Sequence, residues 1–365
     1  MARQSTRVSI TEDGTVVLVD PDFDSLPLLR SVDPCFRVQR APLAGFAKPR
    51  FVRLRSLGSG IAADQLLLEA DASLWKPTAP SGNRRVVPCE ASALDVRIEL
   101  ARRALAQCNL CARRCGVDRT RNELGVCGLG ADARVAEHFV HIAEEASINP
   151  SLVLNLAGCG LRCRYCQQGA LLNPALVGGE LLTPDLWSSL DARGARSLSL
   201  VGGNPDESVY AILRFLAAAP ANWHLPIVWN THAYATPETL RLLDGVVDCY
   251  LPDFKYGSEE CGRRLSGISE YPATAHAAIA GMLKQGVPVI VRVLVLPGHF
   301  DCCHAPALES LAGLPQENLS VSVRGQYTPD WKITPRDGTL ARRVTPEETV
   351  RVCQRASDLE LRLVG

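Results

Sequence analysis

The feature that most constrains the fold is a strand, loop and helix pattern that repeats from about residue 150 to the end of the chain. Its strand segments are short runs of Val, Ile and Leu without strict alternation, as expected of parallel strands buried on both faces. We expect strands at 151–157, 197–203, 226–231, 248–254, 287–297 and 319–325, and helices at 206–219, 236–245, 271–286, 304–314 and 345–361. The last helix has a clear start signal, because Thr345, Pro346 and Glu348 fit an N-cap, a first-turn proline and a capping box.

Repeated units of this kind predict an α/β fold with a parallel sheet and right-handed crossovers. Six strands are too few for a complete eight-fold barrel and fit either a partial barrel or a doubly wound sheet. We predict a partial (β/α)6 TIM-like barrel with an N-terminal Cys-rich extension and a small irregular α+β N-terminal region. In either architecture the chemistry lies at the C-terminal ends of the strands.

Three domains follow from this pattern. Residues 1–94 form an irregular region with short strands, two of them around an Asp-Gly turn at 7–19, and a Pro-rich linker at 74–88. Residues 95–149 hold a helix at 95–107 and then a Cys-rich metal-binding segment, and residues 150–365 form the barrel.

Composition excludes several function classes. The chain has 365 residues with 39 basic and 39 acidic side chains, a balance that argues against a broad electrostatic grip on nucleic acid or anionic lipid. Aromatic residues are 5%, which argues against a base-stacking surface. The sequence contains neither a run of 18 apolar residues nor an apolar signal segment at its start. We therefore expect a cytoplasmic protein that binds neither nucleic acid nor membrane.

The 14 cysteines predict metal sites rather than disulfides, because the cytoplasm keeps thiols reduced. Two groups stand out. The four-cysteine set consists of Cys108, Cys111, Cys115 and Cys127, and the three-cysteine set consists of Cys159, Cys163 and Cys166.

The three-cysteine set follows the first barrel strand with C-x3-C-x2-C spacing. A 4Fe–4S cluster for electron transfer normally has all four irons capped by thiolates, so three thiolates leave one iron open. An open coordination position is typical of a metal site that binds substrate. A zinc site or a structural loop is the alternative, although zinc would need a fourth ligand close by.

This loop resembles the signature of the radical S-adenosylmethionine enzymes. The segments at 228–267 and 289–303 are similar to the pyruvate formate-lyase activating enzyme group, in particular its related branch. The resemblance covers roughly residues 105–361 and is strongest over 150–300. It implies a 4Fe–4S cluster that reductively cleaves S-adenosylmethionine to a 5′-deoxyadenosyl radical. It also implies oxygen sensitivity and a low-potential electron donor such as flavodoxin or ferredoxin.

The resemblance also implies cofactor-binding residues. Tyr165 matches an aromatic residue near the adenine. Gly202, Gly203 and Asn204 match a Gly-Gly-Glu motif whose backbone meets the methionyl amino group, with Asn204 in place of the usual Glu.

Further matches lie at the ends of later strands. Arg292 matches an arginine that contacts the cofactor, for which a buried ion pair is the alternative. Asn230, Thr231 and Asp253 match residues near the cofactor that help to hold a monovalent cation, with Asn230 in place of an Asp. For Asp253 and Lys255 a salt bridge is an equal alternative.

The four-cysteine set provides a closed set of thiolates, suited to a fully ligated iron–sulfur cluster or a structural zinc. The second C-x2-C knuckle of a zinc ribbon is absent, and unmetallated thiols are a third possibility. The set is flanked by Arg113, Arg114, Arg119 and Arg121, which could offset the negative charge of a cluster or simply solvate a loop.

Other signals receive no catalytic role. Cys302 and Cys303 follow a strand end and could face the substrate, although inert thiols are the favoured interpretation. His138, His141, Glu144 and Glu145 could line the cleft, although a solvated helix or loop face is favoured. His299 lies near the site by strand position alone.

The sequence therefore predicts a radical enzyme that abstracts hydrogen from a protein, peptide or small molecule. A dedicated glycyl-radical activase is one version of this function. An iron–sulfur electron-transfer or metal-carrier protein without chemistry of its own is the alternative from another class.

Overall fold

The computed structural model describes residues 7–10, 16–19, 53–56 and 87–364, except 221–222 and 224. Its main sheet has eight strands in the order β12-β11-β10-β9-β8-β6-β5-β7. Six of them run parallel in chain order: β6 (Ser151–Leu156), β8 (Ser197–Gly202), β9 (Ile227–Thr231), β10 (Cys249–Pro252), β11 (Val289–Leu294) and β12 (Leu319–Arg324). The sheet stays open between β12 and β7, so the α/β partial-barrel prediction is confirmed.

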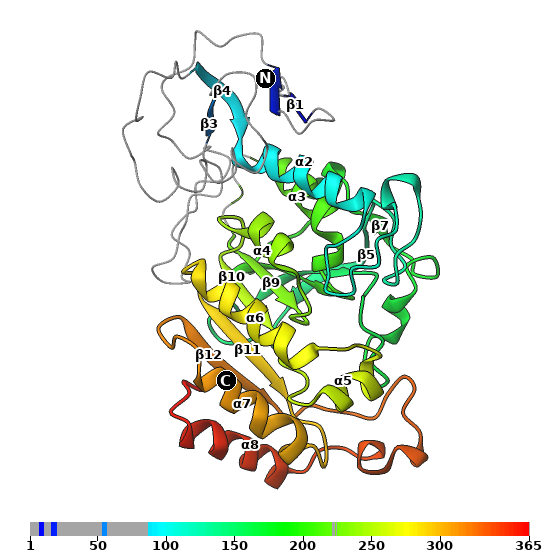
Figure 1. Ribbon diagram of the computed structural model, residues 1–365, viewed down its shortest axis with the longest axis vertical. Coiled ribbons are helices and arrows are strands. Elements are labelled where there is room, and N and C mark those ends of the chain that lie inside the picture. Colours follow the sequence, from blue (N-terminus) through cyan, green and yellow to red (C-terminus); the bar gives the residue numbers. More distant parts are fainter. Residues whose placement is uncertain are drawn as a thin grey trace.

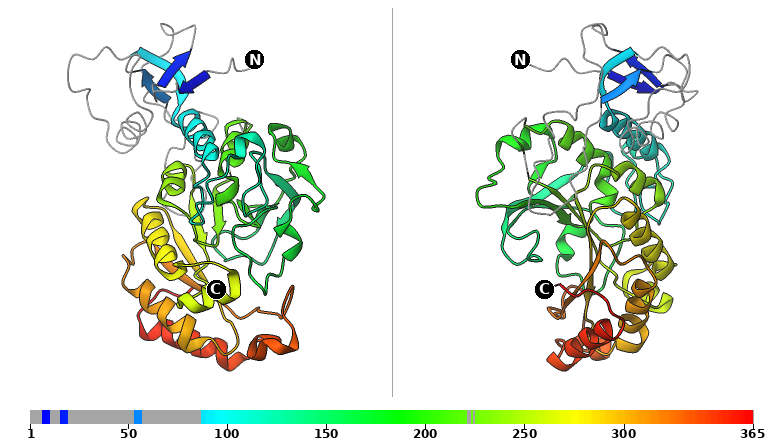
Figure 2. Two further views of the ribbon diagram at one scale, coloured as in Figure 1. Left: turned by 45° about the vertical axis from the view of Figure 1, so that its right-hand side comes forward. Right: turned by 90° about the vertical axis from the view of Figure 1, so that its left-hand side faces the viewer.

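Every residue of β6, β9 and β10 is buried, which explains why these segments are mainly apolar and lack the alternation of a strand with one exposed face. Helices α4 (Pro237–Leu243), α6 (Tyr271–Lys284), α7 (Ala305–Ala312) and α8 (Pro346–Asp358) pack against one another in chain order beside the sheet (Figures 1 and 2). Helices α2 (Ala93–Ala106) and α3 (Val209–Ala217) pack together at the other end. Among the described helices, none is long and apolar enough to cross a membrane.

The predicted helices are all present, and α8 begins as expected. The Thr345 hydroxyl accepts from the Glu348 amide, while the Glu348 carboxylate accepts from the Thr345 amide at 2.9 Å. The sequence interpretation missed α5 (Glu259–Ser266) and the antiparallel strands β5 (Arg134–His141) and β7 (Glu180–Leu181). His138 and His141 lie on β5, so the expected helix or loop at this segment is wrong.

In the N-terminal region, β1 (Arg7–Ile10) pairs with β2 (Val16–Val19), as predicted for the Asp-Gly hairpin. Strand β3 (Arg53–Ser56) pairs with β4 (Val87–Ser92). The predicted linker at 74–88 lies mostly outside the described residues.

A buried ion-pair cluster ties the segment between β5 and β6 to the far strands of the sheet. The Glu145 carboxylate accepts from Arg292 on β11 at 2.6 and 2.8 Å and pairs with Arg324 on β12 at 2.7 Å. Arg292 also pairs with Glu144. The solvated face expected for Glu144 and Glu145 is therefore wrong, because both carboxylates are withdrawn from solvent and pair with an arginine more than 140 residues away in the chain.

Burial alone would raise the pKa of Glu145, but the hydrogen bonds and charges of Arg292 and Arg324 outweigh it and lower the pKa to about 2. A carboxylate with a lowered pKa in the folded chain contributes stability above its unfolded pKa. That contribution is lost as the pH falls from the unfolded value of 4.5 toward 2.

We expect Glu145→Gln to lower the free energy of unfolding at pH 7 by about 3 kcal/mol, because it removes the carboxylate partner of Arg324 and leaves Arg292 with Glu144 alone. The variant should also lose part of the acid dependence of stability. Urea unfolding of metal-free protein, followed by circular dichroism at a series of pH values, measures both. The control is Glu309→Gln, which removes an exposed pair with Arg355 and should change stability little. Equal stability of Glu145→Gln and the unmodified chain would contradict this account.

Candidate metal and cofactor site

The three-cysteine set lies on the loop that follows β6, at the carboxyl edge of the sheet. Cys159 is buried, and Cys163 and Cys166 are partly exposed. The loop is fixed by backbone hydrogen bonds from Gly158 to Leu171 at 2.7 Å and from Arg164 to Leu265 at 2.8 Å. The sequence analysis predicted that this loop begins at the C-terminal end of a strand, and the structure confirms this position.

A chain of hydrogen bonds leads from Cys163 into the core. Ser266 Oγ donates to Cys163 Sγ at 2.9 Å, Ser266 and the Tyr256 hydroxyl lie 2.6 Å apart, and the Tyr256 and Tyr165 hydroxyls lie 2.7 Å apart. The Tyr165 ring packs edge-on against the rings of Tyr256 and Tyr327. Tyr165 therefore supports the loop from behind, and the adenine contact implied by the resemblance stays a prediction.

Gly202 and Gly203 allow the end of β8 to approach the cysteine loop. A Cβ at Gly202, whose φ is +102°, would lie 2.3 Å from the Leu156 amide nitrogen, and one at Gly203 would lie 2.0 Å from the Gly158 carbonyl oxygen. No side chain larger than that of glycine fits at either position, so the backbones of β8 and the cysteine loop lie in direct contact here.

Asn155 on β6 presents an unused acceptor at the same place. Its amide nitrogen donates to Glu137 at 3.0 Å and to Gln168 at 2.8 Å. Its oxygen is buried without a hydrogen-bond partner among the described residues, and it lies 2.6 Å from the position of a Cβ on Gly202. A buried polar atom without a partner is costly unless a ligand satisfies it.

A buried acidic cluster that the sequence interpretation missed lies beside the loop. Glu207 Oε1 accepts from the Gly160 amide at 2.8 Å, and its other oxygen accepts from Asn204 at 2.6 Å. His232 Nε2 lies 3.3 Å from Glu207, and its amide donates to Asn204 at 3.0 Å. Burial opposes ionisation of Glu207, yet His232 and the hydrogen bonds lower its pKa. The sequence signal that could have revealed this cluster is the group of polar residues that follows each of two buried strands.

The remaining predicted residues lie on neighbouring strands. Asn230 on β9 is opposite Leu251 on β10, and Asp253 pairs in register with Arg292 on β11. Asp253 accepts from Lys255 at 2.6 Å, and Arg292 takes part in the Glu145 ion-pair cluster. The structure thus contains the ion pairs given as alternatives for these residues, while their cofactor and cation roles stay predictions.

The four-cysteine set converges in space. Cys115 and Cys127 sulfurs lie 3.5 and 3.1 Å from the position of a Cβ on Gly125. Burial raises the pKa of the Cys127 thiol to about 11, with a further increase from Cys108, whereas Arg119 opposes the shift.

Arg119 is buried against these thiols. Its guanidinium donates to the Gly130 carbonyl at 2.6 and 2.9 Å and lies 3.6 Å from Cys108 Sγ. Among the described residues, no carboxylate forms an ion pair with Arg119. Arg119 is therefore placed to offset the negative charge that these cysteines would carry as thiolate ligands of a metal.

The two cysteine sets meet at Gly160. Cys111 Sγ lies 3.4 Å from the position of a Cβ on Gly160, the residue after Cys159. Arg113, two residues after Cys111, donates to the Gly160 carbonyl and to the Gly267 carbonyl. Glu207 raises the pKa of both Cys111 and Cys159, after burial as the main cause, so its carboxylate lies near both sets.

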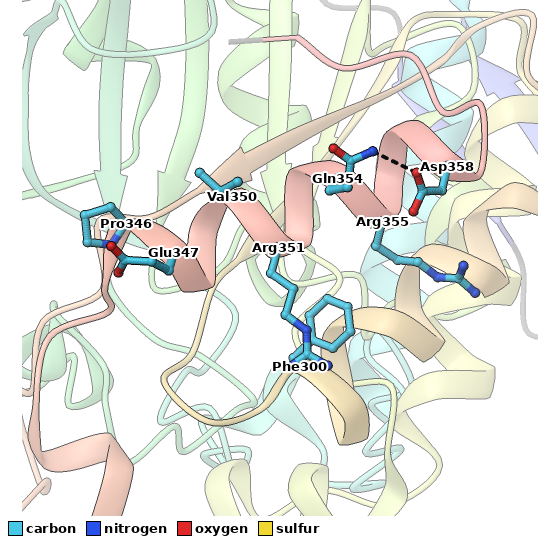
Figure 3. Close-up of a pocket in the computed structure, with 8 residues that line it drawn as sticks. All are labelled: Phe300, Pro346, Glu347, Val350, Arg351, Gln354, Arg355 and Asp358. Atoms are coloured by element: carbon cyan, nitrogen blue, oxygen red, sulfur yellow. Dashed lines mark hydrogen bonds between the residues drawn. The ribbon is translucent and has the colours of Figure 1, made fainter.

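One surface pocket lies away from these cysteines, on the exposed side of α8 (Figure 3). Its floor includes Phe300, whose ring lies 3.8 Å beneath the Arg351 guanidinium. Its lining contains no cysteine or histidine, and we assign it no function.

Comparison with known proteins gives one relative at family level. No protein-family model matches the chain. Among solved structures, Streptococcus suis SuiB bound to S-adenosylmethionine has a TM-score of 0.40 at 15% identity, covering 56% of this chain and 47% of that one. The structure of anSMEcpe with bound AdoMet and the Cp18Cys peptide has a TM-score of 0.39 at 14% identity, covering 57% and 58%. At these TM-scores neither likeness supports a conclusion about this chain.

The uncharacterized protein MJ0674 of Methanocaldococcus jannaschii is 30% identical over 282 residues, which are 74% of this chain and 80% of that protein. This chain therefore belongs to the same family as MJ0674.

Proposed function

We propose that the chain is a radical S-adenosylmethionine enzyme in which Cys159, Cys163 and Cys166 hold a 4Fe–4S cluster with one open iron. The observation that carries the proposal is that Cys163 and Cys166 lie near enough to Cys159 to add to the rise that burial causes in its pKa, at the sheet edge where the glycine end of β8 and the unpartnered Asn155 oxygen also lie. Together, the cluster and S-adenosylmethionine would supply a 5′-deoxyadenosyl radical that abstracts hydrogen from a protein, peptide or small-molecule substrate.

The spacing of the sulfurs favours clusters over single ions. A tetrahedral zinc would hold its thiolates about 3.8 Å apart. In the described part of the chain, neither cysteine set contains three sulfurs that all lie within 4.8 Å of one another. Wider spacing suits a cubane, in which each thiolate binds a different iron.

The chain's own residues would orient the cofactor. Gly202 and Gly203 let the end of β8 lie directly against the backbone of the cysteine loop, and the Asn155 oxygen beside Gly202 is an acceptor for the ammonium group of the cofactor. Ser266 donates to the Cys163 sulfur, a contact that tunes a thiolate ligand and fixes its direction. A low-potential flavodoxin or ferredoxin is the proposed electron donor, and glycyl-radical activation is one version of the reaction.

We further propose that Cys108, Cys111, Cys115 and Cys127 hold a second, fully ligated iron–sulfur cluster. The buried Arg119 supports this choice, because it provides a positive charge suited to four thiolates around a cluster. The contact of Cys111 with Gly160 brings the two proposed clusters close together.

The first prediction concerns the open cluster. Anaerobically reconstituted protein with dithionite and S-adenosylmethionine should form 5′-deoxyadenosine, and Cys163→Ala should not, because it removes a thiolate ligand. Chromatographic quantification of 5′-deoxyadenosine measures the difference. Cys353→Ala, on α8, is the matched control and should retain product formation. Equal product from Cys163→Ala and the unmodified chain would rule out the proposed site.

The second prediction concerns Asn155. Asn155→Ala should raise the Kd for S-adenosylmethionine about tenfold, since a hydrogen bond to a charged group is worth roughly 1.5–3 kcal/mol. Anaerobic equilibrium dialysis with labelled S-adenosylmethionine measures the affinity. Asn318→Ala, in the turn before β12, serves as the control. An unchanged Kd would remove Asn155 from the proposed cofactor site.

The third prediction separates the second cluster from zinc. Arg119→Met should lose about half of the iron and sulfide of the reconstituted protein, because four irons belong to each of two clusters. Arg121→Met, an exposed neighbour on the same turn, should keep the full content. Loss of zinc rather than iron from Arg119→Met would show a zinc site instead.

A further inference from the structure

Three further thiols meet at the carboxyl edge of the sheet, outside both cysteine sets. The sulfurs of Cys261, Cys302 and Cys303 all lie within 4.8 Å of one another. Cys302 Sγ is 3.8 Å from Cys261 Sγ and 3.8 Å from Cys303 Sγ. Cys261 and Cys303 are buried, and Cys302 is exposed.

We propose that Cys261, Cys302 and Cys303 form a third metal site, which binds a thiophilic divalent cation such as Zn²⁺ and leaves one coordination position open. This site stands apart from the proposed radical chemistry and requires neither an iron–sulfur cluster nor S-adenosylmethionine.

The distances fit a single ion. Two thiolates bound to one ion at the usual Zn–S distance of about 2.3 Å and a tetrahedral angle lie about 3.8 Å apart. Both measured sulfur–sulfur contacts match that value. Three thiolates select a soft cation over Mg²⁺ or Ca²⁺, which prefer oxygen ligands.

Two separate elements hold the ligands in place. Cys261 lies in the first turn of α5, where its amide donates to the side chain of the N-cap Ser258 at 3.2 Å. Cys302 and Cys303 lie on a π-turn at 300–304, in which the amide of His304 bonds the carbonyl of His299. π-Turns are rare in proteins, and many of those that occur lie at functional sites.

The π-turn is also fixed from the side of α8. The Arg351 guanidinium stacks on the Phe300 ring at 3.8 Å (Figure 3). It also forms an exposed ion pair with Asp301 at 3.0 Å. These contacts fix the backbone that carries Cys302 and Cys303. A ligand set that is already in position lowers the free-energy cost of binding an ion.

The charges around the trio suit a thiolate-rich site. Three thiolates and one Zn²⁺ carry a net charge of −1, and Arg264 at the end of α5 supplies a positive charge. Burial acts to raise the pKa of the Cys261 thiol, but hydrogen bonds from Ser258, the neighbouring thiols and Arg264 outweigh burial and lower it. Burial, followed by the charge of Cys261, raises the pKa of Cys302 and Cys303, so binding of the ion would displace the protons of these two thiols. Arg264 is held by His299 Nε2 at 3.3 Å.

The position of the trio indicates what the open site faces. Cys261 and Ser266 are five residues apart on α5, so Cys261 lies about 8 Å along the helix axis from Ser266, whose hydroxyl donates to Cys163. With Cys302 exposed, the fourth position opens to solvent at the carboxyl edge, where this fold class binds substrates. A water molecule or a substrate thiol fits that position.

Site-resolved alkylation of the full chain tests the proposal without any activity assay. Anaerobic, EDTA-treated protein is labelled with iodoacetamide in the presence and absence of Zn²⁺, and digested peptides are quantified by mass spectrometry. At a Zn²⁺ concentration ten times the Kd, labelling of Cys302 should slow about tenfold, because the bound thiolate no longer reacts. Cys353 in the same digest is the internal control, and Mg²⁺ should protect neither residue.

The variant Cys261→Ser should abolish the protection of Cys302, since two thiolates hold the ion far less tightly than three. The unmodified chain already gives a decisive result if that variant does not fold. Labelling of Cys302 at the same rate with and without Zn²⁺ would overturn the proposal. Recovery of a Cys302 disulfide from freshly prepared anaerobic protein would also overturn it, in favour of a redox pair.

Discussion

Buried negative charge is the constraint on which the arrangement around the cysteines depends. Thiolates and carboxylates that leave water cost several kcal/mol each unless they are paired. The structure places a cation or a hydrogen-bond donor beside each concentration of acidic groups: Arg119 at Cys108, His232 at Glu207, and Arg264 at Cys261. The Glu145 ion-pair cluster solves the same problem inside the sheet, with two guanidinium groups around one carboxylate.

The parallel sheet explains why these groups meet. Its six parallel strands all end at one edge, so loops that are distant in sequence become neighbours. Glycines then allow the backbones to touch: Gly202 and Gly203 lie against the loop that carries Cys159, and Gly160 lies against Cys111. The closeness of the two cysteine sets thus follows from the fold and from residues that lack a side chain.

The sequence was sufficient for features that are local. Apolar runs predicted all six parallel strands, and the Thr345 capping box predicted the start of α8. Spacing alone divided seven of the cysteines into two sets, and their role as metal ligands stays a prediction.

Features that depend on distant partners could not be predicted. Glu145 appeared solvated because its partners lie on β11 and β12, and β5 was missed because its pairing with β6 decides its structure. Glu207, Asn155 and Cys261 carried no motif of their own. Their importance appears once the fold places them beside Gly160, Gly202 and Cys302.

The central claim is that the three-cysteine set holds a cluster with an iron open to S-adenosylmethionine. Electron paramagnetic resonance of the reduced, reconstituted protein tests it directly, with Cys163→Ala providing the signal of the second cluster alone. The account predicts that S-adenosylmethionine changes the spectrum of the unmodified chain and leaves that of the variant unchanged. A spectrum of the unmodified chain that is identical with and without S-adenosylmethionine would contradict it.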